Sequence, residues 1–135
     1  MGIMTTEIDI ELNLLVWAVG LAFIQVVLAI VGAVSQLGLT TLAGNRENLP
    51  STVGWVARAQ RAHRNMLENL VLFAALVIIT KLAGASNEMT VLGSQLFFWG
   101  RAAYAVIYIV GIPWIRTGAY VISIVGLIMI FLQLI

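Results

Sequence analysis

One stretch of the sequence, near residues 58–69, carries more polar chemistry than its apolar surroundings lead one to expect. Its hydrogen-bonding and charged side chains are Arg58, Arg61, Arg64, Asn65, Glu68 and Asn69. A helix turns 100° per residue, so all of them fall within an arc of about 140°. If this were only a charged helix end whose side chains extend to the lipid headgroups, arginine or lysine would suffice, and these residues could lie on any face of the helix. The one-sided mixture of guanidinium, carboxamide and carboxylate groups instead favours a hydrogen-bonded network inside a bundle.

A second group contains an arginine that needs a partner. Arg101, Tyr104 and Tyr108 are spaced so that they share one helix face. A charge at mid-bilayer costs about 2.5–3.5 kcal/mol, so we expect Arg101 to meet the first group near Glu68. Two plainer interpretations remain open: an ion pair that only locks the bundle, and tyrosines that form an interfacial aromatic belt.

A third group stands near the C-terminal end of the sequence. Arg116, Tyr120 and Ser123 share a helix face, and Thr117 adds a hydroxyl group. A guanidinium at the mouth of a bundle suits a carboxylate or a thiolate ligand. The alternative is an ordinary arginine on the cytoplasmic side of a membrane.

The composition indicates which kind of protein must position these groups. The chain has 135 residues, of which 61% are hydrophobic and 10% charged, and its mean hydropathy is +1.04. A small soluble domain cannot bury so much apolar surface, so a soluble enzyme is excluded. A net charge of +1 offers nucleic acid no basic surface, and one histidine with no cysteine predicts no metal site. We therefore predict a small integral membrane protein.

Four apolar stretches are long enough for helices that cross a bilayer, which takes about 20 residues each. We expect spans at about 12–36, 58–82, 88–112 and 116–134, within a single domain of residues 1–135. Residues 37–57 read as a loop, Ser51 or Thr52 could cap the following helix, and Pro113 ends the third span. Short later loops make neighbouring helices antiparallel. The predicted fold class is all-α, an up-down four-helix bundle.

Basic residues predict the orientation of the bundle. Four of them, Arg46, Arg58, Arg61 and Arg64, lie in the loop between the first two spans or at the start of the second span. Arg116 lies at the last loop, between the third and fourth spans. The other side has an acidic N-terminus and Lys81. The positive-inside rule therefore places the arginine-rich loops in the cytoplasm and both termini on the non-cytoplasmic side.

The segment Arg61-Ala62-His63-Arg64-Asn65-Met66-Leu67-Glu68-Asn69 resembles the Arg-Ala-His-x-Asn-x-x-Glu-Asn signature of the MAPEG family. These are membrane-associated proteins in eicosanoid and glutathione metabolism. The resemblance covers most of the chain and continues through Gly100-Arg101, Tyr108, Pro113-x-x-Arg116 and Tyr120. It implies a homotrimer that binds glutathione as a cosubstrate between neighbouring subunits.

The resemblance also implies roles for individual residues. Positions that match glutathione contacts of the family are Arg61, Arg64, Asn65, Glu68, Tyr108, Arg116 and Tyr120. We add Arg101 and Tyr104 as candidate binding residues, because they share a helix face with Tyr108. By the same resemblance, Arg116 lies near the sulfur and stabilises the thiolate. Thr117 keeps the hydroxyl of a serine found in some members. A cation beside a thiol lowers the pKa of that thiol, which makes the nucleophile more abundant.

The activity that the resemblance implies is a glutathione-dependent transferase or peroxidase acting on small lipophilic electrophiles that arrive through membrane lipid. Two departures keep a second interpretation open. The segment Gln36-Leu37-Gly38-Leu39-Thr40 lacks an arginine that glutathione-using members often have, and Met66 replaces a common aspartate. The alternative is a non-catalytic accessory or scaffold subunit of a larger membrane complex, or a lipid-binding protein. A transporter has less support, because no internal repeat or central acid pair is present.

Overall fold

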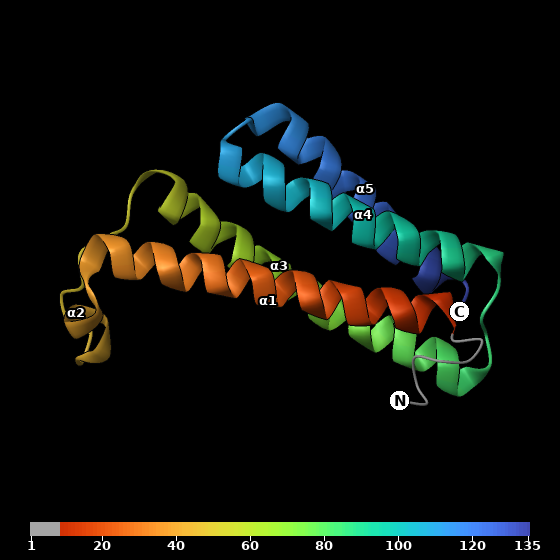
Figure 1. Ribbon diagram of the computed structural model, residues 1–135. Helices are drawn as coiled ribbons and strands as arrows, with labels where there is room; N and C mark the ends of the chain where they lie inside the picture. The colour runs from red at the N-terminus through yellow and green to blue at the C-terminus, as the bar shows by residue number, and fades with distance from the viewer. Residues whose placement is uncertain (1–8) are drawn as a thin grey trace.

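The computed structural model describes residues 9–135, and all regular structure in that range is helical (Figure 1). The helices are α1 (Ile10–Leu37), α2 (Leu39–Ala43), α3 (Gly54–Ala83), α4 (Glu88–Val110) and α5 (Pro113–Leu132). The all-α prediction is thus confirmed for the described residues. The predicted loop of residues 37–57 contains the short helix α2, which the sequence analysis did not foresee.

Three helices, α1, α3 and α5, are long and apolar enough to cross a membrane. α4, with 23 residues, is also long enough to cross a membrane, but it is not among the helices of residues 9–135 that are apolar enough to do so. Its polar residues Gln95 and Arg101 lower its hydropathy. Large apolar side chains cover the outer surface of the helices, among them Trp17, Phe23 and Trp114. Such a surface is suited to lipid.

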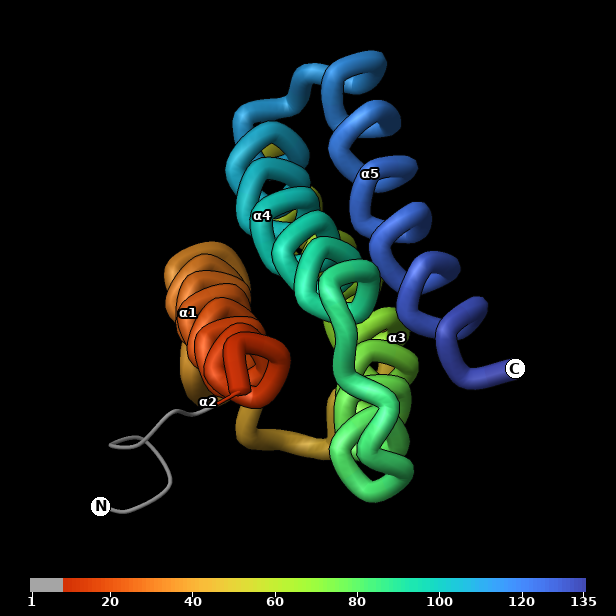
Figure 2. The backbone as a smooth tube through the Cα atoms, turned by 90° about the vertical axis from the view of Figure 1, so that its right-hand side faces the viewer, coloured from red at the N-terminus to blue at the C-terminus, as the bar shows by residue number. Residues whose placement is uncertain are grey.

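The four long helices run antiparallel to their neighbours in sequence, and α4 packs against the other three (Figures 1 and 2). Two ends of the molecule can be defined. At the termini end, α1 and α4 begin and α3 and α5 finish, as the 2.8 Å hydrogen bond from Asn87 Nδ2 to Gln133 Oε1 illustrates. At the opposite end, called the loop end, α1 and α4 finish and α3 and α5 begin. There Arg58 Nε donates to the Ile109 carbonyl oxygen at 2.9 Å and ties α3 to α4.

The core is built from apolar side chains of all four long helices. Phe73 of α3 stacks on Phe97 of α4 with ring centroids 4.2 Å apart. Between α4 and α5 the packing is closer, because Gly93, Gly100 and Gly126 lie buried on the contact. Small residues let membrane helices approach closely and gain van der Waals contact.

Two predicted helix ends are corrected by the structure. The N-cap of α3 is Val53, with no side-chain cap, so neither Ser51 nor Thr52 caps it; Thr52 Oγ1 donates to Gln60 Oε1 instead. Pro113 is the first residue of α5, where its missing N–H costs nothing. The preceding helix has already ended at Gly111, whose φ of +97° favours glycine.

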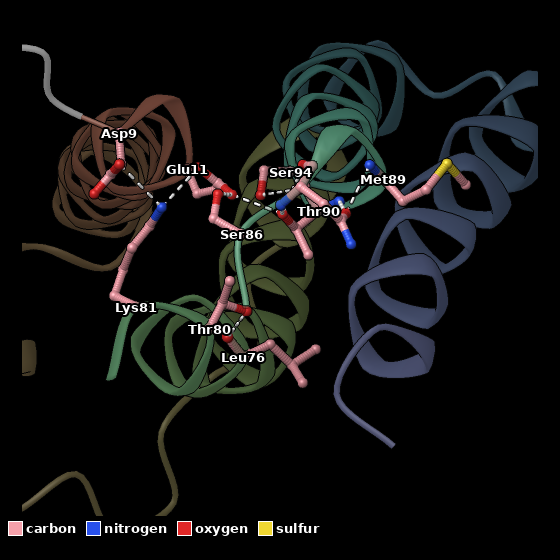
Figure 3. Close-up of polar contacts among 10 residues, drawn as sticks. Asp9, Glu11, Leu76, Thr80, Lys81, Ser86, Met89, Thr90 and Ser94 are labelled. Carbon is pink, nitrogen blue, oxygen red and sulfur yellow. Dashed lines mark hydrogen bonds and ion pairs between the residues drawn. The ribbon is translucent and has the colours of Figure 1, made fainter. Parts of the chain in front are cut away.

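A buried carboxylate joins three segments at the termini end (Figure 3). Glu11 is 2% exposed, and its Oε1 accepts a hydrogen bond from Lys81 Nζ at 2.9 Å. Its Oε2 accepts from the hydroxyls of Ser86 and Thr90. Lys81 also lies 3.3 Å from Asp9. This cluster holds α1, the end of α3 and the start of α4 together.

Replacing Glu11 by glutamine tests how much this cluster contributes. Glu11→Gln keeps an acceptor for Lys81 but removes the charge, so the free energy of unfolding is expected to fall by about 1 kcal/mol. Thermal unfolding in detergent measures the change. Asp9→Asn is the matched control and is expected to have little effect, because Asp9 is about half exposed. An equal loss in both variants would contradict a special role for Glu11.

Candidate functional site

Arg101 is the central residue of the predicted site, and it is only 1% exposed. Its Nη2 donates to Asn65 Oδ1 at 2.6 Å. Its guanidinium carbon lies 4.3 Å from the ring centroid of Tyr104 and 5.6 Å from that of Tyr120. Arg101 therefore meets residues 58–69 as expected, but its partner is Asn65 and not Glu68.

Among residues 9–135, no acidic side chain pairs with the charge of Arg101. Its Nε and Nη1 atoms are buried and have no hydrogen-bond partner in the described part of the chain. The ion pairs found within residues 9–135 are those of Lys81 with Asp9 and Glu11, at the termini end. A buried cation is costly unless it is paired and hydrogen-bonded. The site is thus electrostatically suited to an anion.

A small cavity of about 210 Å³ is lined by Asn65, Tyr104 and Tyr120, the three residues that contact Arg101, although Arg101 itself is not part of the lining. Its lining comes from three helices: Asn65 of α3, Tyr104 of α4, and Arg116, Thr117 and Tyr120 of α5. Because α5 begins at Pro113, its first two turns bring these three residues to the cavity. Thr117 Oγ1 donates to the Pro113 carbonyl oxygen at 3.2 Å.

Aromatic rings connect the arginines around this cavity. The Tyr104 ring lies 5.4 Å from the Tyr108 ring and 5.8 Å from the Tyr120 ring, centroid to centroid. The guanidinium carbon of Arg116 is 4.4 Å from the Tyr108 ring centroid. Arg61 Nε donates to the Tyr108 hydroxyl at 3.1 Å. Tyr108 thus contacts two guanidinium groups: its hydroxyl accepts a hydrogen bond from Arg61, and its ring makes a cation–π contact with Arg116. These contacts orient both arginines.

The structure does not gather every residue of the predicted network. Arg64 and Glu68 are exposed and lie outside the small cavity, and no ion pair within 4.0 Å joins them in residues 9–135. Arg58 is committed to the Ile109 carbonyl oxygen. Asn69 donates to the Asn65 carbonyl oxygen at 2.9 Å. The expected single network therefore divides into an inner part around Asn65 and an outer, exposed part.

Sequence reasoning missed Glu11, the buried carboxylate at the other end. The sequence analysis places an acidic N-terminus and Lys81 on the same side of the membrane but predicts no pairing between them. The signal was present: antiparallel spans place the start of the first helix beside the end of the second, where Glu11 and Lys81 have opposite charges.

The arrangement around Arg101 can bind an anion and lower the pKa of an acidic group placed there. It is cationic and walled by aromatic rings, and Arg101 is buried, while the cavity next to it opens to the surface at Thr117. In the residues that the structure describes, no three histidine, aspartate or glutamate side chains gather to hold a metal ion.

The MAPEG family model matches residues 14–135, nearly the whole chain. No curated protein and no solved structure matches the chain. The match runs from residue 14, within α1, to the end of α5 and beyond, and it includes the whole site around Arg101. The chain therefore belongs to the MAPEG family, membrane proteins of eicosanoid and glutathione metabolism, and is an integral membrane protein.

Proposed function

We propose that this protein is a glutathione-dependent transferase or peroxidase that acts on small lipophilic electrophiles. The observation that carries the proposal is the buried Arg101 guanidinium, two of whose nitrogen atoms have no hydrogen-bond partner among residues 9–135. The side chains that it contacts, Asn65, Tyr104 and Tyr120, line a cavity together with Arg116. Glutathione brings carboxylates and a thiol, and these are the groups that such a site stabilises. Membership of the family supports the choice of this thiol.

Each residue of the site has a role in this proposal. Arg101 and Asn65 bind a carboxylate of the tripeptide, and the Tyr104 and Tyr120 rings hold the Arg101 guanidinium in place. Arg116 lies next to the thiol and lowers its pKa, so that more thiolate is present at neutral pH. Thr117, whose hydroxyl donates to the Pro113 carbonyl oxygen in the free protein, would turn that hydroxyl toward the reacting groups when substrate binds. Tyr108 positions Arg61 and Arg116 for these tasks.

The size of the small cavity supports an assembly of several copies. About 210 Å³ is less than the roughly 300–1,000 Å³ of most small-molecule sites. A whole tripeptide would therefore extend beyond one chain and lie against a neighbouring copy. Arg64 and Glu68, exposed on α3, would then complete the site from that copy, with Glu68 binding the amino group of glutathione.

We propose accordingly a homotrimer of up-down four-helix bundles. Contacts with the other helices and copies would shelter the polar α4 as the fourth span, and the loop end would face the cytoplasm. An electrophile that diffuses in the lipid would reach the thiol from the membrane side of the loop end.

Replacing Arg116 tests the proposed thiol chemistry. Arg116→Ala is expected to reduce the fraction of bound glutathione present as thiolate about tenfold or more, because the nearby cation is lost. Ultraviolet difference absorbance of the thiolate measures that fraction, and isothermal titration of the purified protein measures glutathione binding. Arg116→Lys is the control and should retain much of the thiolate. Equal thiolate signals for wild type and Arg116→Ala, or no saturable glutathione binding at millimolar ligand, would reject the proposal.

A specific observation favours the alternative of a non-catalytic scaffold subunit. Gln36 stands in the segment where glutathione-using members often have an arginine, and its amide is already occupied. Its Nε2 donates to the Val53 carbonyl oxygen at 3.0 Å, and its Oε1 accepts from the Val53 N–H at 3.0 Å. Co-purification of a larger partner in a fixed ratio, without glutathione binding, would support the scaffold.

A further inference from the structure

The turn between α4 and α5 lies at the loop end, and its shape sets the direction of α5 (Figure 1). α4 ends at Gly111, and α5 begins only two residues later, at Pro113. The backbone N–H groups of Gly111 and Ile112 both donate to the Ile107 carbonyl oxygen, at 2.9 and 3.2 Å. Arg116 is the fourth residue of α5, so its position follows directly from this turn.

One carbonyl oxygen in the last turn of α4 has its partner in another helix. A helical carbonyl accepts a hydrogen bond from the N–H four residues later, and for Ile109 that residue is Pro113, which has no N–H. The Ile109 oxygen accepts instead from Arg58 Nε of α3, at 2.9 Å. The guanidinium also places a positive charge at the negative end of the helix dipole. Arg58 is therefore a C-terminal cap of α4 that a different segment supplies.

Gly111 leaves room for this guanidinium. A Cβ atom at Gly111 would lie 3.3 Å from Arg58 Nε and 3.4 Å from its Cζ, and the residue has a φ of +97°. A side chain here would have to push the guanidinium aside and would also strain the backbone. The turn and the arginine therefore fit together as one unit.

The capped turn also carries Tyr108, which contacts the arginine proposed to lie next to the thiol. Tyr108 directly precedes Ile109, and its ring centroid is 4.4 Å from the guanidinium carbon of Arg116. Arg61, three residues after Arg58 on α3, donates to the Tyr108 hydroxyl at 3.1 Å. Arg58 and Arg61 thus hold two adjacent residues of α4, the first through its backbone and the second through its side chain.

We propose that Arg58 is a positioning residue for Arg116. Arg58 holds the last turn of α4 and the start of α5, so that Arg116 stays against Tyr108 and beside the thiol. This role rests on the proposed thiol chemistry. Arg58 does not line the small cavity, so its loss should reduce thiolate formation and leave glutathione affinity near that of the wild type.

A pH titration of bound glutathione separates positioning from a purely structural role. In Arg58→Met, the thiolate fraction at neutral pH is expected to fall about threefold, which corresponds to a rise of about half a unit in the pKa of the thiol. Ultraviolet difference absorbance at saturating glutathione gives the titration curve. Arg58→Lys keeps a donor and a charge and should restore most of the wild-type curve. The control is Glu11→Gln, which weakens the termini end and should leave the curve unchanged.

Gly111→Ala tests the same contact from the other side. It keeps the charge of Arg58 but displaces the guanidinium from the Ile109 oxygen, so the titration curve should shift as it does in Arg58→Met. In the double variant the two shifts should not add, because both substitutions remove one shared contact. If Arg58→Met fails to fold, Gly111→Ala alone carries the test.

Two results would overturn the proposal: a wild-type titration curve in Arg58→Met or Gly111→Ala, and shifts that add in the double variant. Arg116→Ala, measured in the same series, distinguishes this failure from failure of the proposed function. A wild-type curve in Arg116→Ala would reject the thiol chemistry itself. A shifted curve in Arg116→Ala together with a wild-type curve in Arg58→Met would show that Arg58 only caps α4.

Discussion

An Arg101→Met variant is expected to unfold at a higher temperature than the wild type and to lose glutathione binding. Arg101 is buried, has no acidic partner among the described residues, and leaves two nitrogen atoms without hydrogen bonds. Methionine has a similar length and carries no charge. Replacing a buried ion pair with apolar side chains of similar volume often stabilises by about 1–4 kcal/mol. We expect a gain at the low end of that range here, because the hydrogen bond to Asn65 is lost together with the unmatched charge. Thermal unfolding in detergent, without ligand, measures this gain.

The same replacement should weaken glutathione binding about 100-fold, because a buried charged hydrogen bond to a ligand carboxylate is lost. Isothermal titration measures the affinity. Arg58→Met is the control with the opposite pattern. Arg58 ties α3 to α4 through the Ile109 carbonyl oxygen, so this variant should lose stability and keep its affinity. A loss of stability in Arg101→Met would show that Arg101 is a structural residue, against the proposed role.

The positions of the long helices follow from local properties of the sequence, which explains why they could be predicted. Long apolar runs determine where the helices lie, while the end of α4 at Gly111 was not predicted, since Pro113 was expected to end it. The clustering of Asn65 and Arg101 was also foreseen, because an intramembrane arginine requires a polar partner and few are present. The first prediction rests on one segment at a time, and the second rests on the cost of an unpartnered charge in the membrane.

The parts that could not be predicted depend on pairs of segments. The choice of Asn65 over Glu68 as the partner of Arg101 depends on the rotation of α3 against α4. Successive residues of a helix are 100° apart, and sequence periodicity does not predict the rotation of α3 about its axis more precisely than that. The burial of Glu11 likewise depends on Ser86 and Thr90 arriving from another segment.

The second large effect is expected at the contact between α4 and α5. A Cβ atom at Gly126 would lie 2.8 Å from the Phe97 nitrogen and 3.1 Å from the Leu96 Cβ. A backbone atom cannot move aside as a flexible side chain can, so the helices themselves would have to separate. Gly126→Leu is therefore expected to lower the free energy of unfolding by about 3 kcal/mol. Thermal unfolding in detergent measures the loss.

The control for this prediction is the same substitution in the same helix. At Gly118 a Cβ atom would meet nothing within 4 Å, so Gly118→Leu should be neutral or slightly stabilising through better helix propensity. Separation of α4 and α5 would also move Arg116 and Tyr120 away from Arg101 and Tyr104. Gly126→Leu should thus lose glutathione affinity along with stability, although it touches no residue of the small cavity. Equal stability of the two leucine variants would mean that the close contact of α4 and α5 does not hold the site together.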